Sequence, residues 1–392
     1  MSTDSSSQDL LRDDEVKGHV GPIELLFDLV YVFTIIQLSH YVVEHLSVLG
    51  LAQATVLFLA VWWGWNYTAW AMNWLNPHSR TVQLLLAVLM LAALCMAIAT
   101  PYAFSDRATL FVSAYLVLQL VRSAFMVYAF RGQQMGQNYA QLLVWSGASG
   151  VLWVAGLFVP EDARLYVWAL AVIVDYAAPR FGYWVPGKGA TAMSSWPLTE
   201  SHLAERNRLV FIIALGESVL VLGGALVGIE YSFAVIVAAI AGFTTMFLLW
   251  WLYFDYRQGN AEHEVDDDTD TTAAARGAYA YAHALMVGGA IMVAVGIEEV
   301  VHHPLGDTPA MVAVAIVAGP IIYLVGNFLF QRALWGRSPV SRFMGMGLLL
   351  LVGLTAIVLP PVGVSLLVVA VGLGLAVVDS REKTEVPSAA HT

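Results

Sequence analysis

The chain has 392 residues, of which 59% are hydrophobic and 12% are charged, and its mean hydropathy is +0.71. Soluble domains carry charges on about a quarter of their residues, so this composition excludes an ordinary soluble protein and indicates a polytopic membrane protein. The net charge of −11 is concentrated in the N-terminal tail and in residues 262–270, and no basic surface supports nucleic-acid binding.

The first twenty residues are polar and acidic, and they lack the apolar core of a cleavable signal peptide. We expect residues 1–20 to form a disordered acidic tail in the cytoplasm, and residues 381–392 to form a second disordered tail. Cys95 is the sole cysteine, which excludes an internal disulfide.

Apolar segments fill the rest of the chain and predict about twelve transmembrane helices in an all-α fold. In chain order they cover residues 24–45, 50–75, 81–100, 108–131, 139–159, 163–179, 207–228, 231–254, 275–300, 309–331, 343–359 and 361–379.

The basic residues give an independent test, because cytoplasmic loops collect Lys and Arg. With the N-terminus inside, fifteen of the 18 Lys and Arg residues fall on the inner side, and only Arg107 and Arg164 fall on the outer side. The remaining one, Arg122, lies within the fourth segment. This distribution favours an even number of spans with both termini in the cytoplasm.

The longest inner loop is rich in Pro and Gly and separates six helices from six. We therefore expect a first half at residues 21–180, a cytoplasmic linker at 181–206 and a second half at 207–380. The two halves also echo each other, since LVYVFTIIQLS at residues 29–39 resembles LVFIIALGESV at 209–219. Two parallel six-helix repeats would explain the echo, and so would generic membrane composition.

Two longer stretches carry a resemblance to a known family. They are GPIELLFDLVYVFTIIQLSH at residues 21–40 and HLAERNRLVFIIALGES at residues 202–218. In this order they closely resemble the signature regions of the bacterial low-temperature-requirement A (LtrA) family, and the resemblance extends to the last helices. The chain departs from the pattern at Asn207 and Arg208, so the start of the seventh helix is left open. The resemblance implies a multi-helix protein of the bacterial cytoplasmic membrane, named for a growth requirement in the cold, without an established biochemical activity.

Glu24 and Asp28 lie four residues apart near the inner end of the first helix and so share one face of it. One interpretation is structural, because acidic residues in the first turns favour the positive end of a helix and cap its free amides. The other is that they meet His202, Glu205 and Arg206 of the inner loop and form a cytoplasmic gate or an ion-coordinating cluster.

Glu217 interrupts the seventh segment about 15 Å past its start, near the middle of a hydrocarbon core about 30 Å thick. A carboxylate at that depth is costly, which makes it a candidate functional group. Arg122 lies at a similar estimated depth and is its candidate partner. A permanent pair would be a structural clip, whereas a pair that breaks would let Glu217 carry a proton or a cation.

The outer ends of two helices carry His and Glu at a spacing of four residues, namely His40 with Glu44 and Glu299 with His303. If they converge, they could hold a divalent metal or a haem edge. The competing interpretation is that these are ordinary solvated helix ends, so any cofactor stays unknown. Asp175 and Asp255, near inner helix ends, are expected to be interfacial caps.

No Walker loop, GxGxxG, GxSxG, HExxH or haem-attachment motif occurs, which argues against an ATP-driven pump and favours a protein that is not an enzyme. The features favour proton- or ion-coupled movement of a small solute past Glu217 between the two halves. The alternatives are a metal or haem redox protein or enzyme within the membrane, and a non-transporting structural component. The lipid bilayer is the expected partner, and the oligomeric state is open.

Overall fold

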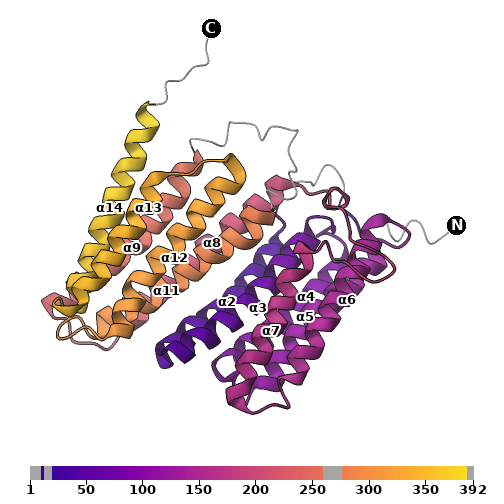
Figure 1. The fold of residues 1–392 in the computed structure, drawn as a ribbon, viewed down its shortest axis with the longest axis horizontal. Coiled ribbons are helices and arrows are strands. Elements are labelled where there is room, and N and C mark those ends of the chain that lie inside the picture. Colours follow the sequence, from indigo (N-terminus) through magenta and orange to yellow (C-terminus); the bar gives the residue numbers. More distant parts are fainter. Residues whose placement is uncertain (1–9, 13–19, 259–275, 386–392) are drawn as a thin grey trace, which may run out of the picture. The chain divides into compact units, whose positions relative to one another are not determined.

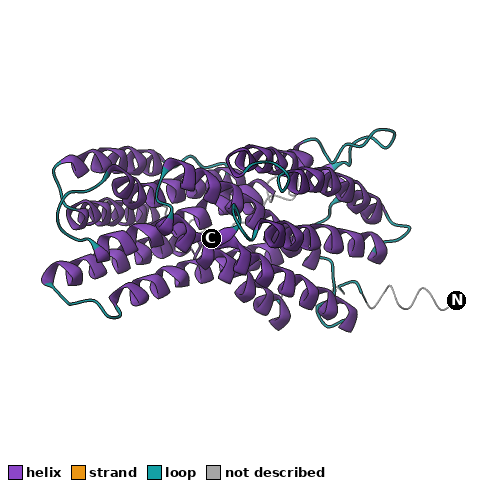
Figure 2. Ribbon diagram, turned by 90° about the horizontal axis from the view of Figure 1, so that it is seen from below, coloured by secondary structure: helices purple, strands orange, loops and turns teal. Residues whose placement is uncertain are grey.

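The structure is a computed structural model that describes residues 10–12, 20–258 and 276–385. Within these residues it contains twelve α-helices and no strand (Figure 2). Ten of the helices are long and apolar enough to cross a membrane. These observations confirm an all-helical, polytopic membrane fold.

The chain divides into two compact units, Met1–Val210 and Phe211–Thr392, and helix α8 runs through the boundary. The helices of the first unit are α2 (Pro22–Glu44), α3 (Val48–Met72), α4 (Arg80–Ala99), α5 (Ala108–Ala129), α6 (Gln134–Ala155), α7 (Glu161–Arg180) and the first part of α8 (Glu200–Leu226).

In the first unit, α4 packs against α2 and α5, and α6 packs against α5 and α7 (Figure 1). Helix α3 contacts α2, α5 and α7. Its second half is buried on every side, including Trp62, Trp63, Trp65 and Trp70. These tryptophans therefore fill the core of the bundle, and any polar group beside them is removed from water.

The second unit contains α9 (Phe233–Gln258), α11 (His283–His302), α12 (Ala310–Trp335), α13 (Val340–Leu354) and α14 (Pro361–Glu385), with a π-helical turn at Arg276–Ala282 before α11. Helices α11 and α12 approach through glycines: a Cβ on Gly289 would lie 2.6 Å from the Tyr323 nitrogen, and one on Gly319 would lie 2.6 Å from the Val293 nitrogen. Such small residues are a common device for packing membrane helices closely.

The structure differs from the sequence-based boundaries at three places. Helix α8 begins at Glu200, seven residues before the expected start of the seventh segment. Residues 10–12, expected within a disordered tail, instead pair with residues 74–76 at the end of α3. Helix α14 continues to Glu385, into the expected C-terminal tail. The acidic loop at 262–270 lies outside the described residues.

Candidate functional site

The first turns of α2 carry two buried carboxylates. Gly21 precedes the helix and Pro22 is its first residue, a position where the missing amide hydrogen of proline costs nothing. Glu24 accepts a hydrogen bond from the Gly21 amide at 2.8 Å, so it does cap the helix. Asp28 follows one turn later. Both side chains are 0% exposed, which capping alone does not require.

Arg206 of α8 joins these two carboxylates. Its Nε and Nη2 donate to the two oxygens of Asp28, at 2.9 and 2.5 Å, and its Nη1 donates to Glu24 Oε1 at 2.9 Å. Trp65 of α3 adds a third donor to Asp28, through Nε1 at 2.8 Å. The planar guanidinium thus grips one carboxylate with a two-pronged contact and reaches the second with its remaining nitrogen.

Glu24 has two further partners from distant parts of the first unit. His202 Nε2 lies 2.8 Å from Glu24 Oε1, and Arg12 Nη2 donates to Glu24 Oε2 at 2.9 Å. We call Arg12, Glu24, Asp28, His202 and Arg206 the inner ionic cluster, after the inner helix end at which Glu24 and Asp28 are expected from the sequence. It joins the N-terminal segment, α2 and the start of α8.

Asn73, just after α3, fixes the protonation of His202. The Thr199 amide donates to Asn73 Oδ1 at 2.8 Å, so the other end of the Asn73 side chain is the NH₂ group. That group donates to the Thr199 carbonyl at 2.9 Å and lies 3.4 Å from His202 Nδ1. Because an amide NH₂ only donates, Nδ1 is the acceptor, and the proton of neutral His202 sits on Nε2 and points at Glu24.

With His202 neutral, the charges of the inner ionic cluster balance, since two guanidiniums face two carboxylates. All five side chains are at most 8% exposed. Removing ions from water costs several kcal/mol each, and only good geometry and additional hydrogen bonds offset that cost. The cluster meets both conditions. It is therefore a balanced, buried group of charges, and loss of any one charge would leave the remaining buried charges unbalanced.

Four of the five residues that were candidates for this cluster meet in the structure, namely Glu24, Asp28, His202 and Arg206. Glu205 does not, because it lies on another part of the α8 surface and is partly exposed. The sequence interpretation missed Arg12, Trp65 and Asn73. The signal for Arg12 was the apolar pair Leu10–Leu11 in an otherwise polar tail, and both Leu10 and Arg12 are buried.

Arg122 is 0% exposed and lies on α5. Its Nη1 donates to the Gly64 carbonyl and to Thr68 Oγ1, at 3.2 and 3.3 Å, and its Nη2 donates to Gln119 Oε1. Its Cζ lies 5.2 Å from the centre of the Tyr67 ring. These partners are all neutral.

Asp175 on α7 is 4% exposed, so the expectation of an interfacial cap is wrong for this residue. The side chain of Asp255 lies outside the described part of the structure. Its Oδ2 accepts from the Tyr115 hydroxyl at 2.7 Å and from Trp153 Nε1 at 3.5 Å. Gln119 Nε2 donates to the Tyr115 oxygen at 2.7 Å. A continuous chain of hydrogen bonds therefore connects Asp175 to Arg122 through Tyr115 and Gln119.

Glu217 belongs to the second unit and is 2% exposed. It lies nine residues before the end of α8 at Leu226, or about 13 Å along the helix axis, so it is well inside the apolar span Ser201–Leu226. Arg122 belongs to the first unit, and its pairing with Glu217 stays a prediction.

The candidate metal ligands His40, Glu44 and His303 are exposed, and Glu299 is partly buried. Among the described residues, no group of three or more His, Cys, Asp or Glu side chains is arranged to hold a metal ion. The convergence of His40 and Glu44 with Glu299 and His303 stays a prediction.

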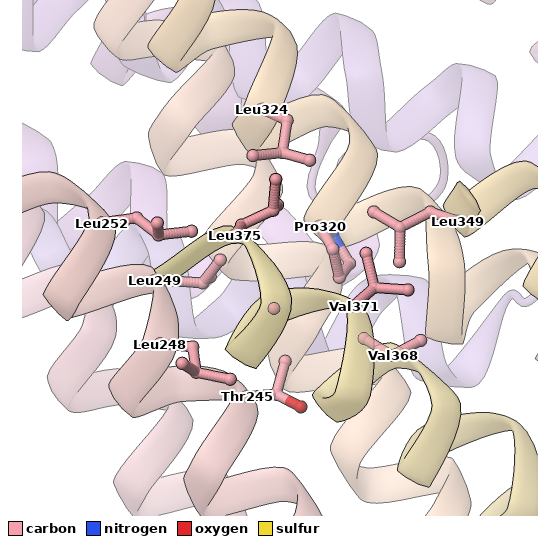
Figure 3. A pocket seen from close by; sticks show the side chains of 11 residues that line it. Thr245, Leu248, Leu249, Leu252, Pro320, Leu324, Leu349, Val368, Val371 and Leu375 are labelled. Atoms are coloured by element: carbon pink, nitrogen blue, oxygen red, sulfur yellow. The ribbon is translucent and has the colours of Figure 1, made fainter. Parts of the chain in front are cut away.

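A small cavity of about 20 Å³ lies between α9, α12, α13 and α14 of the second unit (Figure 3). Its lining is apolar, with Leu248, Pro320, Leu349 and Leu375 around it, and the hydroxyl of Thr245 is already bonded to Ala241 within its own helix. This cavity therefore offers no group for chemistry or for binding a polar solute.

Comparison with known proteins agrees with the resemblance of the two signature stretches. Residues 19–377 match the family model described as bacterial low temperature requirement A protein (LtrA). An uncharacterized protein of Rhizobium meliloti is 36% identical over 330 residues, which cover 83% of this chain and 80% of that protein. The residues that match the family model, 19–377, contain α2, α8 and every residue of the inner ionic cluster except Arg12. The chain belongs to the LtrA family of bacterial membrane proteins.

Proposed function

We propose that this protein moves a small solute across the membrane, coupled to a proton or another ion, and that the inner ionic cluster is a gate of that pathway. The observation that supports the proposal is the burial of two carboxylates and two guanidiniums inside a bundle of apolar helices. Ionisable groups in such a setting are costly, and they are typical of ion and substrate pathways.

The geometry of the cluster suits a gate. Arg206 carries one guanidinium whose hydrogen bonds to Glu24 and Asp28 hold the start of α8 against α2. Exchange of these partners for water or for a solute would release α8 in a single step, since interfaces of this kind have discrete closed and open states. The competing hypothesis is a permanent structural clip.

His202 gives the gate a group that can respond to protons. In the closed arrangement its Nδ1 accepts from Asn73. Protonation would turn that acceptor into a donor facing the NH₂ group of Asn73, which breaks this contact and adds a positive charge to a balanced cluster. The expected consequence is a weaker closure.

We further propose that Glu217 is the mid-membrane carboxylate that carries the coupling proton or cation. Its burial on α8 supports this assignment, because a buried carboxylate interacts strongly with a proton or a cation. Arg122 and Glu217 would pair in one state of the cycle and separate in another.

We also propose that all twelve helices span the bacterial cytoplasmic membrane as two six-helix repeats, with both termini inside. Two exposed loop positions test the orientation in a Cys95→Ala background, with His78→Cys on the expected inner side and Asp106→Cys on the expected outer side. In intact spheroplasts, a membrane-impermeant maleimide should label only the variant carrying Asp106→Cys. Labelling of only the variant carrying His78→Cys would mean that the orientation is opposite to the proposed one.

Accessibility of a buried position beside the cluster tests the gate. Asn207 is 1% exposed and follows Arg206, and its side chain donates only to a carbonyl of its own helix, so Asn207→Cys perturbs little else. In inside-out vesicles, Asp28→Asn should speed maleimide labelling at this position at least severalfold, because it removes the two-pronged contact of Arg206.

The exposed neighbour Arg208→Cys is the control, and it should be labelled rapidly with and without Asp28→Asn. Equal, slow labelling of Asn207→Cys in both backgrounds, in protein that remains folded, would mean that the cluster is a permanent clip.

A further inference from the structure

Arg122 has no carboxylate ion-pair partner among the described residues of its own unit, and its surroundings differ from those of other buried arginines. Arg206 and Arg342 each grip a carboxylate with two nitrogen atoms. Arg164 donates to the Gly156 carbonyl at the carboxyl end of α6, where a helix is electronegative. Arg122 has neither arrangement, although its guanidinium stays charged at any physiological pH.

Asp175 is linked to Arg122, but it does not neutralise it by direct contact. Tyr115 and Gln119 stand between the two charges, and the Asp175 oxygen that faces α5 is taken by the Tyr115 hydroxyl and by Trp153. The chain therefore orients the Gln119 carbonyl toward Arg122 as a neutral acceptor. A partial dipole replaces the full negative charge that a buried guanidinium favours.

Two buried donors near Arg122 lack an acceptor. Among the residues that the structure describes, Arg122 Nε and the Tyr31 hydroxyl find no hydrogen-bond partner, and both residues are at most 1% exposed. Both side chains approach Gly64: Arg122 donates to its carbonyl, and a Cβ on Gly64 would lie 2.3 Å from the Tyr31 oxygen. A buried donor without an acceptor in the protein is a candidate position for a bound water molecule or ion.

We propose that Arg122 and Tyr31 form a binding site for a small anion within the first unit. A fixed positive charge with an unused N–H and a neighbouring O–H is what an anion requires. The close packing at Gly64 restricts the ligand to an anion with one to three non-hydrogen atoms, such as chloride or formate. Binding does not depend on transport, whereas a role of this anion as solute or coupling ion rests on the proposed function.

The test uses purified full-length protein in detergent, titrated with sodium chloride or sodium formate against sodium gluconate at equal ionic strength. Calorimetry should detect binding of the two small anions and not of gluconate. Tyr31→Phe keeps the ring and removes one hydrogen bond to a charged ligand, so it should weaken binding about tenfold. Arg122→Gln should abolish binding. Tyr128→Phe, at an exposed tyrosine of α5, is the control and should bind like the parent protein.

Absence of chloride and formate binding in the parent protein, or equal affinity in the Tyr31→Phe variant, would overturn the proposal and leave water as the occupant. If small anions bind only after Glu217→Gln, the anion at Arg122 is that carboxylate, and the proposal also fails. Proton flux in proteoliposomes separates failure of the anion site from failure of the proposed function. If the protein binds the anion but shows no anion-dependent proton flux, the binding site stands and the role of this anion in transport is rejected.

Discussion

Removing Arg206 should destabilise the protein strongly, because this residue bonds to both carboxylates of the inner ionic cluster. Its three hydrogen bonds satisfy two carboxylates that are 0% exposed. Loss of one partner of a buried ion pair costs about 3–5 kcal/mol, and we expect this cost for Arg206→Gln. Asp28→Asn should cost a similar amount, because it leaves Arg206 with Glu24 alone.

The double variant separates pairing from general damage. If the two residues acted independently, the costs would add to about 6–10 kcal/mol. Because each single change already breaks the shared contact, the loss of stability in the double variant should be smaller than the sum of the two single losses by about 2–3 kcal/mol.

The assay is reversible unfolding of purified protein in mixed micelles, followed by tryptophan fluorescence. Arg208→Gln, at the exposed next-but-one position, is the matched control and should change the unfolding free energy by less than about 0.5 kcal/mol. Additivity of the two single changes within about 0.5 kcal/mol would refute the argument that Arg206 and Asp28 stabilise the fold as a pair.

Two further predictions concern other contacts, measured by the same unfolding assay. Gly64→Ala should lower the unfolding free energy by about 1–3 kcal/mol, because the new methyl group meets the Tyr31 hydroxyl. Tyr31→Phe in that background should recover part of the lost stability, since the ring carbon of Tyr31 lies at an ordinary contact distance of 3.6 Å. If stability does not recover, the strain lies at another contact. Arg342→Gln should cost about 3–5 kcal/mol by leaving Asp379 unpaired, whereas Arg332→Gln at an exposed site should cost less than about 0.5 kcal/mol; equal effects would contradict the importance of the buried pair.

Hydropathy predicted the positions of the helices because a membrane helix must be apolar along its whole length. It failed at the start of α8, where Glu200, His202, Glu205 and Arg206 look like a solvated loop. The helix begins earlier because His202 and Arg206 lie one turn apart on one face and find buried partners on α2. Pairing, rather than apolar character, permits a helix there.

Part of the inner ionic cluster could be predicted from the sequence. The spacing of Glu24 and Asp28 gave a shared face, and the charged start of α8 gave candidate partners. Arg12 and Asn73 were missed because a basic residue in a polar tail and an amide after a helix have no distinctive spacing. Asp175 was misplaced because its partners, Tyr115 and Trp153, come from two other helices and cannot be read from its local sequence.

Growth of a deletion strain in the cold, the trait for which the family is named, tests the proposed coupling most directly. The strain would express the parent protein, Glu217→Gln, or the control Glu205→Gln, which changes a partly exposed carboxylate of the same helix, and membrane levels would be matched. The account predicts that the parent protein and Glu205→Gln restore growth and that Glu217→Gln does not. Full rescue by Glu217→Gln would contradict a coupling mechanism that depends on an ionisable carboxylate within the membrane.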